Sequence, residues 1–492
     1  MQGKGGGRGG SLNRLRAVGL LCVLGAGSMA VAVAHFGSPA EFGLAGVATA
    51  SRTLNQLTAV MLTCIALVVP LTANLYTPRL VRLYVTHPLI VTALSVLIFS
   101  HLLVLSSSFF PAGHPASRVL VYAISGTYLL VLAATLPFLY AVSQFLRPAY
   151  FLPMLTRRGE QAFARWARGR DPEENAHQLF ETIDVVTNVA LTGMNRSDRQ
   201  LVLLALQALH TLLGTLLQST ARAEPGWRRT VPRFVPGLAL EGQAYLTRQG
   251  IWPEAYLLAQ MLKVMENATR SQHEILAEVA RHLVESAALA QRRGQETVVD
   301  LHVMAFNTLM RQAVEDRDLR RFQNISYHYR LLIEAFEAHP ARLFAAAEQL
   351  LHYGNLAAKQ ELHFGLEIVL YDLGELVLCL AARNEALAMD LVRLHAGPLW
   401  QRSIAAGSQM RKVGWRTLLR VHWEARATGR QELAELLHWS YLFDDTIHRE
   451  QLEWVLDENR ELHFEFNDRL MRFAHFSAPA EAEARAFAEG PA

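Results

Sequence analysis

Four apolar runs dominate the first third of the chain, and they cover residues 17–36, 57–76, 89–109 and 119–145. None contains Asp, Glu, Lys or Arg, and each has the roughly 20 residues that a helix needs to cross a ~30 Å hydrocarbon layer. Because backbone amides cannot stay unpaired in lipid, each run predicts a helix. No convincing cleavage region follows the first run, so we expect it to be a span and not a signal peptide. The sequence predicts a four-helix transmembrane domain over residues 17–145, preceded by a tail at residues 1–16.

Basic residues gather at one end of the predicted spans. They precede span 1, separate span 2 from span 3 and follow span 4: Lys4, Arg8, Arg14, Arg16, Arg79, Arg82, Arg147, Arg157 and Arg158. The other two loops, at residues 37–56 and 111–118, carry only Arg52 and Arg118. The positive-inside rule therefore predicts cytoplasmic N- and C-termini and two short outer loops.

Composition agrees with a chain whose first third is embedded in a membrane. It is 51% hydrophobic and only 18% charged, where a soluble protein has about 25% charged residues. Residues 1–150 hold nine basic side chains and one acidic one, which leaves 38 basic and 43 acidic residues for the remainder. This near-neutral balance does not favour nucleic-acid binding, and three cysteines exclude a disulfide scaffold.

Several polar and helix-breaking residues lie inside the predicted spans. Pro70 and Pro137 lie toward the cytoplasmic ends of spans 2 and 4, where each can kink its helix. Thr72 and Asn74 follow the first kink, and His101 is an ionisable residue within span 3. These five residues are candidates to line a pore or to form hinges. The alternative is that the prolines are ordinary features of spanning helices and that His101 is a hydrogen-bonded structural residue.

Two segments carry a resemblance to a known family. Residues 72–80, TANLYTPRL, and residues 178–200, QLFETIDVVTNVALTGMNRSDRQ, are similar to blocks of an uncharacterised family of bacterial predicted membrane proteins. The chain departs from that family at residues 192–198, where the sequence TGMNRSD replaces the Ser-Pro…Asn-Asp-Pro sequence that is usual in the family. The resemblance implies four N-terminal spans, a large cytoplasmic region and a multi-pass protein of the bacterial inner membrane. It implies no activity.

A basic and aromatic segment follows span 4 at residues 146–170. Arginines near anionic headgroups and aromatic side chains at the interface would suit a helix on the inner leaflet. The predicted membrane-surface residues are Arg147, Arg157, Arg158, Arg165, Trp166 and Arg168. The alternative is a solvated connector between the spans and the next domain.

Residues 171–476 predict an all-helical cytoplasmic domain. Short polar turns separate amphipathic helices near residues 196, 294, 317, 383 and 429, which indicates stacked α-hairpins, although their spacing does not establish a strict repeat. Asp198, Asp318, Glu385 and Glu432 are placed to complement helix starts. The apolar run at 201–217 predicts a buried helix, with a fifth span as the alternative. Residues 477–492, rich in Ala and Glu, are predicted to be disordered.

Signals of chemistry are weak in this sequence. His438, Asp444, Asp445 and His448 form one group with metal-ligand spacing, and His352, Glu361 and His363 form a second, but with 19 histidines such groups arise by chance. No H-E-x-x-H or G-x-S-x-G motif is present. We therefore expect no metal site, no cofactor and no enzyme activity.

The function that this sequence favours is a membrane-anchored scaffold or sensor that binds a cytoplasmic protein through its helical domain. The alternative is a homo-oligomeric channel for ions or small solutes, gated by that domain. The expected partners are the lipid bilayer, a cytoplasmic protein and further copies of the chain.

Overall fold

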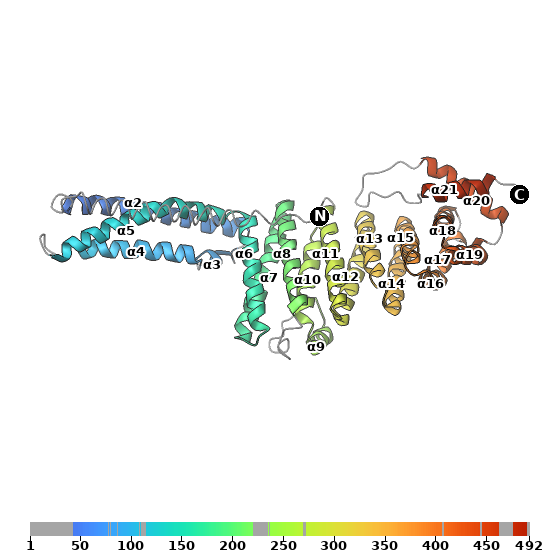
Figure 1. Cartoon of the computed structure of the whole chain (residues 1–492), viewed down its shortest axis with the longest axis horizontal. Helices are drawn as coiled ribbons and strands as arrows, with labels where there is room; N and C mark the ends of the chain where they lie inside the picture. The colour runs from blue at the N-terminus through green and yellow to red at the C-terminus, as the bar shows by residue number, and fades with distance from the viewer. Residues whose placement is uncertain are drawn as a thin grey trace. The chain divides into compact units, whose positions relative to one another are not determined.

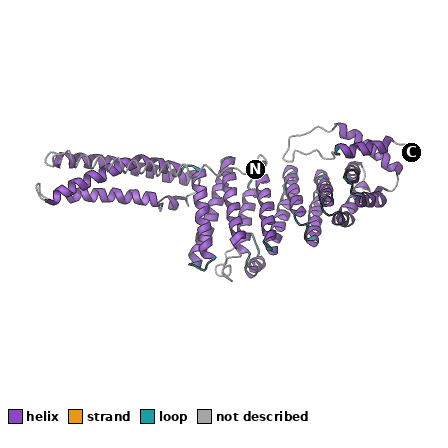
Figure 2. Cartoon of the chain, in the orientation of Figure 1, coloured by secondary structure: helices purple, strands orange, loops and turns teal. Residues whose placement is uncertain are grey.

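The computed structural model describes residues 43–76, 78, 80–85, 87–107, 109, 115–219, 235, 237–268, 272–405, 408–442, 445–461 and 476–489. The regular elements that these residues form are all helices, and no strand is among them, which confirms the predicted all-α fold (Figures 1 and 2). The chain divides into two compact units. The first lies within residues 1–157 and 184–204, and the second within residues 158–183 and 205–492.

The first unit is built from apolar helices. They are α2 (Gly43–Leu75), the short α3 (Leu80–Val85), α4 (Pro88–Ser107), α5 (Pro115–Gln144), and the parts of α6 (Pro148–Trp166), α7 (Pro172–Asn195) and α8 (Arg199–Ser219) that fall within its bounds. Helices α2, α4 and α5 pack against one another. Large apolar side chains such as Leu67, Ile98 and Leu136 nevertheless stay exposed on them, so their outer faces suit an apolar surrounding.

Three helices are long and apolar enough to cross a membrane within the part of the chain that the structure describes. They contain residues 51–72 of α2, residues 123–144 of α5 and residues 199–219 of α8, and residues 90–106 of α4 form a shorter apolar helix. Predicted spans 2, 3 and 4 thus correspond to α2, α4 and α5, whereas predicted span 1 lies outside the described residues. Helix α2 already begins at Gly43, so most of the loop predicted at 37–56 is helical, and that prediction is wrong.

Hydrogen bonds fix the segment that follows α2. The Tyr76 hydroxyl donates to the Leu146 carbonyl at 2.7 Å, and the Tyr84 hydroxyl donates to the Phe145 carbonyl at 2.8 Å. The Thr192 hydroxyl of α7 donates to the Tyr76 carbonyl at 2.8 Å. The two segments that carry the family resemblance therefore contact each other in the fold.

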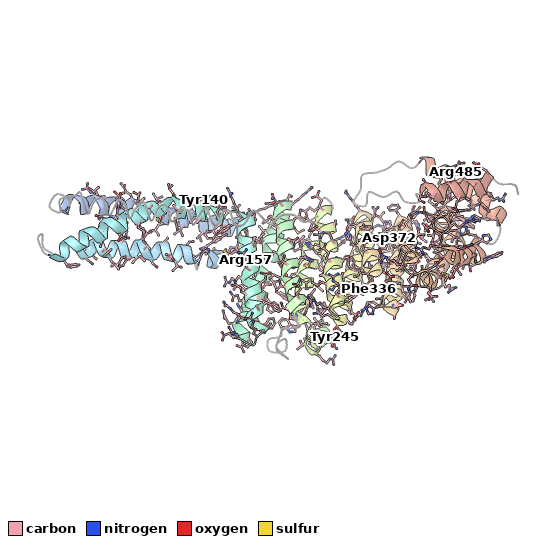
Figure 3. The ribbon with its side chains drawn as sticks, viewed as in Figure 1. Tyr140, Arg157, Tyr245, Phe336, Asp372 and Arg485 are labelled. Carbon is pink, nitrogen blue, oxygen red and sulfur yellow. The ribbon has the colours of Figure 1, made fainter. Side chains whose placement is uncertain are left out.

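The second unit is a stack of helical hairpins in two layers (Figure 1). In one layer α11 (His273–Arg292) packs on α13 (Leu319–Glu334), α13 on α15 (His363–Ala381) and α15 on α18 (Ser408–Ala427). In the other layer α10 (Trp252–Glu266) packs on α12 (Glu296–Glu315), and α12 on α14 (Pro340–Lys359). Phe336 and Asp372 are buried inside this stack (Figure 3).

The remaining helices complete this unit. They are α9 (Leu240–Gln249), α16 (Glu385–Leu391), α17 (Gly397–Ala405), α19 (Gln431–Leu437), α20 (Asp445–Glu461) and α21 (Ala478–Glu489), with π-helical segments at Val392–Ala396 and His438–Leu442. Helix α21 corrects the prediction of a disordered tail at 477–492. It packs on α18 and α20 and buries Ala480 and Ala484, and the Ser477 hydroxyl donates to the Glu424 carboxylate at 2.9 Å.

Successive hairpins repeat at a narrow range of spacings along the sequence. Polar contacts between neighbours join residues separated by 42 to 49 positions: Arg342 to Asp300 and Glu296, Arg383 to Glu337 and Glu334, Ser326 to Asp372, and the Leu433 amide to Glu385. The separation stays narrow over at least three hairpins, so the stack is a regular repeat. The sequence alone had not established that regularity.

Several turns of the stack share one hydrogen-bond pattern. A residue with positive φ follows the helix, as at Gly294 (65°), Arg317 (52°) and Glu361 (63°), and the next backbone N–H bonds to a carbonyl five residues earlier. This is the Schellman arrangement, which ends a helix and reverses the chain. Asp198 and Asp318 then accept the Leu201 and Arg321 amides at 3.0 Å, so both acids act as the helix caps that the sequence predicted.

The apolar run at 201–217 lies within helix α8, and protein side chains cover much of it. It has the length and composition of a membrane span, yet more than half of it is buried among protein side chains. Leu206, Leu209 and Leu213 are fully buried. Burial on this scale favours the interpretation of a core helix over that of a fifth span.

Candidate functional site

The structure gives hydrogen-bond contacts for three of the five predicted pore residues, Thr72, Asn74 and His101. Thr72 is buried, and its hydroxyl lies 2.9 Å from the Val68 and Val69 carbonyls of its own helix. Asn74 is exposed and its carbonyl accepts a hydrogen bond from Arg196 at 2.6 Å. Pro70 and Pro137 lie within α2 and α5. These contacts do not bring the five predicted residues together as one lining.

His101 bridges two helices of the first unit. Its Nδ1 lies 2.8 Å from the Leu97 carbonyl, so this nitrogen donates, and its Nε2 lies 3.0 Å from Oδ1 of Asn55 on α2. Exchange of the amide oxygen and nitrogen of Asn55 lets the NH₂ group donate to Nε2. Both ring nitrogens therefore have partners. This arrangement supports the structural alternative for His101, since hydrogen bonds between apolar helices stabilise their packing.

The basic segment has two different faces. Arg147, Arg157, Arg165 and Arg168 are exposed and Arg158 is half-buried, so they stay candidates for a lipid or solvent surface. Trp166 is fully buried, with its ring centroid 6.0 Å from that of Phe180 and 5.7 Å from that of Trp252. Its assignment to the membrane surface is wrong, because an indole enclosed by protein cannot reach lipid.

Neither metal-ligand group singled out in the sequence forms a close cluster among the side chains that the structure describes. The His438 and His448 ring centroids lie 6.3 Å apart, and Asp444 and the Asp445 side chain fall outside the described set. His352 packs edge-on against Tyr353, and Glu361 occupies a turn. His422 of α18 lies beside His448, at 5.5 Å between ring centroids, a neighbour that the sequence did not indicate.

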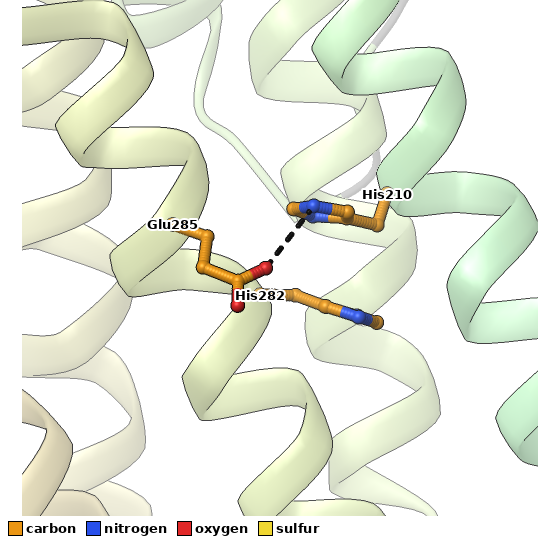
Figure 4. A group of neighbouring side chains, drawn as sticks. All are labelled: His210, His282 and Glu285. Atoms are coloured by element: carbon orange, nitrogen blue, oxygen red, sulfur yellow. Dashed lines mark ion pairs between the residues drawn. The ribbon is translucent and has the colours of Figure 1, made fainter. Parts of the chain in front are cut away.

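A different group brings potential ligands together. His210 of α8 stacks on His282 of α11, with ring centroids 4.1 Å apart and an interplanar angle of 15°, and Glu285 lies beside them (Figure 4). His210 Nε2 is 3.4 Å from a Glu285 carboxylate oxygen. One ligand atom from each of the three side chains lies within 4.8 Å of the others.

Charged neighbours surround the two rings. His282 Nε2 lies 3.1 Å from Glu278 and 2.9 Å from the Arg281 guanidinium, and Arg281 also pairs with both Glu278 and Glu285. Burial lowers the pKa of His282 to about 3, so its ring is neutral at pH 7. The hydrogen bond from Arg281 lowers the pKa of Glu278, which is ionised at that pH. Neutral imidazoles thus lie among anionic carboxylates.

The stacked histidines leave hydrogen-bonding capacity unused. Nδ1 of His210 and Nδ1 of His282 are buried and have no hydrogen-bond partner in the structure. If Arg281 donates to His282 Nε2, the proton on Nδ1 has no acceptor; if Nε2–H donates to Glu278, the lone pair on Nδ1 has no donor. An unsatisfied buried polar group costs about 1–3 kcal/mol. A site that carries two of them is a candidate for function.

His302 of α12 lies beside this group. Its Nδ1 donates to the Val298 carbonyl at 2.8 Å, so its Nε2 accepts from the Ser286 hydroxyl, also at 2.8 Å. This buried ring is therefore held in one tautomer. Burial lowers its pKa to about 4.

That lowered pKa predicts acid sensitivity. The unfolded chain binds a proton near pH 6.5 and the folded chain only near pH 4, so the contribution of His302 is complete above pH 6.5 and is lost as the pH falls toward 4. From pH 7.5 to pH 5 the loss is about 2 kcal/mol. The variant His302→Gln keeps an acceptor for Ser286. Between pH 7.5 and pH 5 we expect its free energy of unfolding, measured with urea, to fall by about 2 kcal/mol less than that of the wild type. His177→Gln, at an exposed position, should behave as the wild type; equal pH dependence in all three proteins would contradict the assignment.

Local sequence gave only a faint indication of this site. Glu278, His282, Glu285 and Ser286 share one face of α11 at helical spacing. His210 is the lone ionisable residue in the apolar run at 201–217. Only the packing of α8 on α11 brings the two parts together.

Comparison with known proteins adds no relative. No family profile, no curated protein and no solved structure matches the chain. What the structure defines is an all-α protein with several apolar helices and a regular stack of hairpins. The resemblance noted above remains a similarity of two short segments.

Proposed function

We propose that this protein is a membrane-anchored scaffold or sensor without enzyme activity, whose hairpin stack binds a protein partner. The observation that carries the proposal is the narrow range of sequence separations, 42 to 49 residues, between contacting residues of successive hairpins. Regular stacks of helical hairpins build extended, continuous surfaces, and such surfaces suit protein recognition. Helices α2, α4 and α5 supply the anchor.

Ion pairs between hairpins support a stack of fixed geometry. Arg342 contacts both Glu296 and Asp300, and Arg383 contacts both Glu334 and Glu337. Each arginine thereby joins two successive hairpins. Large apolar side chains remain exposed on this unit, among them Met304, Leu394 and Trp439. A partner surface would cover side chains of this kind.

Orientation and compartment belong to the same proposal. The distribution of basic residues supports cytoplasmic termini and a cytoplasmic stack, and the family resemblance supports a bacterial inner membrane. The channel alternative, which needs several copies of the chain, has less support, because Thr72 and His101 are occupied by local and interhelical hydrogen bonds. Conductance through liposomes that falls on Asn74→Leu would favour the channel, and a monomer by mass photometry would weaken it.

Protease accessibility tests anchoring and orientation. We expect trypsin to leave the stack intact in spheroplasts and to digest it in inverted inner-membrane vesicles, since its many arginines then face the protease. Recovery of the intact chain in a high-speed supernatant without detergent would contradict the anchor. Digestion in spheroplasts would contradict the orientation.

Site-specific photocrosslinking tests the scaffold itself. A photoreactive residue at Met304, which is 54% exposed on α12, should give one discrete protein adduct in cells. The matched control is Leu136, which is 76% exposed on α5 and is expected to face lipid. We expect no protein adduct at Leu136. If Met304, Leu394 and Trp439 also gave no protein adduct, the result would count against a scaffold.

A further inference from the structure

We propose that His210, His282 and Glu285 bind a divalent transition-metal ion, with zinc as the ion that their chemistry suits. The ligands are one imidazole nitrogen from each histidine and one carboxylate oxygen from Glu285. This proposal does not depend on the scaffold function, since metal binding needs no partner protein.

The distances fit a tetrahedral ion. Zinc lies about 2.0–2.2 Å from nitrogen and oxygen ligands, so two ligands of one tetrahedral ion are about 3.4 Å apart. His210 Nε2 and the Glu285 carboxylate oxygen are already 3.4 Å apart. The third ligand atom lies within 4.8 Å of both. Closure of the site therefore requires His282 to turn out of its stacked arrangement, and no backbone rearrangement is needed to bring the donors near.

The unpartnered nitrogen of His282 supplies the reason for such a turn. Its side chain has no solvent exposure, and its Nδ1 has no hydrogen-bond partner. With Nε2–H donating to the Glu278 carboxylate at 3.1 Å, the lone pair on Nδ1 is left to bind a cation. A carboxylate that accepts from the distal nitrogen of a metal-bound histidine is a common outer-sphere arrangement. Arg281 balances the charge of Glu278 and Glu285.

The donor set selects the ion. Two imidazoles and one carboxylate suit zinc and its neighbours in the first transition row, whereas Mg²⁺ and Ca²⁺ require mostly oxygen ligands. Three protein ligands leave a fourth position for water. Glu285 is half-exposed, so an ion can reach the site from solvent.

Such an ion would join α8 to α11. His210 lies in the middle of α8, and the other two ligands lie on α11. Because α8 has the composition of a membrane span, a metal bridge would hold this apolar helix in the hairpin stack.

Zinc binding to the full chain in detergent micelles tests the proposal. After removal of metal with a chelator, we expect the wild type to take up one Zn²⁺ per chain, measured by elemental analysis, and excess Mg²⁺ not to displace it. Competition with a chromophoric chelator should give an affinity about 100-fold lower for His210→Gln and Glu285→Gln and about tenfold lower for Glu278→Gln. The exposed His177→Gln is the matched control and should equal the wild type.

Two outcomes would overturn the site. One is a wild type that takes up no more zinc than His210→Gln. The other is equal affinity in Glu285→Gln and the wild type, because Glu285 is half-exposed and its substitution leaves the fold intact, which circular dichroism can verify. Replacement of zinc by Co²⁺ should also give the visible absorption of a tetrahedral site in the wild type and not in Glu285→Gln.

Discussion

Trp166→Ala should destabilise the second unit by about 3–5 kcal/mol, because it removes a large, fully buried side chain and leaves a cavity. The indole lies among Phe180 and Trp252, and the Phe180 ring in turn contacts Trp252 at 4.9 Å and Tyr256 at 5.2 Å between centroids. The loss of one ring therefore loosens an aromatic cluster that joins α6, α7 and α10. Urea unfolding of the full chain in micelles, followed by circular dichroism, measures the change.

The chain provides a matched control in Trp439, which is 70% exposed. Trp439→Ala should change the free energy of unfolding by no more than about 0.5 kcal/mol. If Trp166 contacted lipid, its substitution would instead weaken binding to anionic vesicles and leave unfolding unchanged. That result would contradict the core position of Trp166.

The error over Trp166 shows what composition cannot decide. A basic and aromatic segment fits a helix on a membrane surface and equally fits a helix with one buried face. In α6, Phe163 and Trp166 lie three residues apart and are buried, whereas Arg165 of the same helix and Arg168 of the turn after it are exposed. The residue types of this segment do not tell whether protein or lipid covers its aromatic side chains.

Helix ends were easier to predict than the repeat that they form. The turns near residues 196, 294, 317, 383 and 429 follow from acidic caps and from glycines such as Gly294 and Gly429. The regular register was hidden because non-glycine residues, Arg317 and Glu361, take the left-handed conformation at equivalent turns. Without glycine at each turn, the period does not stand out in the sequence.

The tail and the histidine cluster were missed for a similar reason. Ala480 and Ala484 are small and lie in an Ala- and Glu-rich segment, so nothing local indicates that α18 and α20 cover them. His210 and His282 belong to helices far apart in the chain. Their stacking depends on how α8 packs against α11. The sequence around either histidine does not by itself indicate that the two rings meet.

Asp372→Leu should be the most damaging substitution at a charged site, with a loss of about 3–5 kcal/mol, because it breaks a buried polar network. Asp372 is 2% exposed, accepts a hydrogen bond from the Ser326 hydroxyl, and lies 3.7 Å from Nε of Arg330. Arg330 is also buried, and its remaining carboxylate partner is Glu334, at 3.4 Å. Removal of Asp372 leaves the positive charge of the buried Arg330 guanidinium near one carboxylate, that of Glu334, in place of two. Urea unfolding of the full chain measures the loss.

The double substitution Arg330→Met with Asp372→Leu separates charge from packing. Replacement of both partners by apolar side chains removes the unpaired charge, so we expect the pair to be less destabilised than Asp372→Leu alone, with a coupling of about 1–3 kcal/mol. The matched control is Asp390→Ala, which breaks the exposed pair with Arg393 at 3.1 Å and should cost at most about 1 kcal/mol. Additive losses in the double variant would show that Arg330 and Asp372 do not act as a pair.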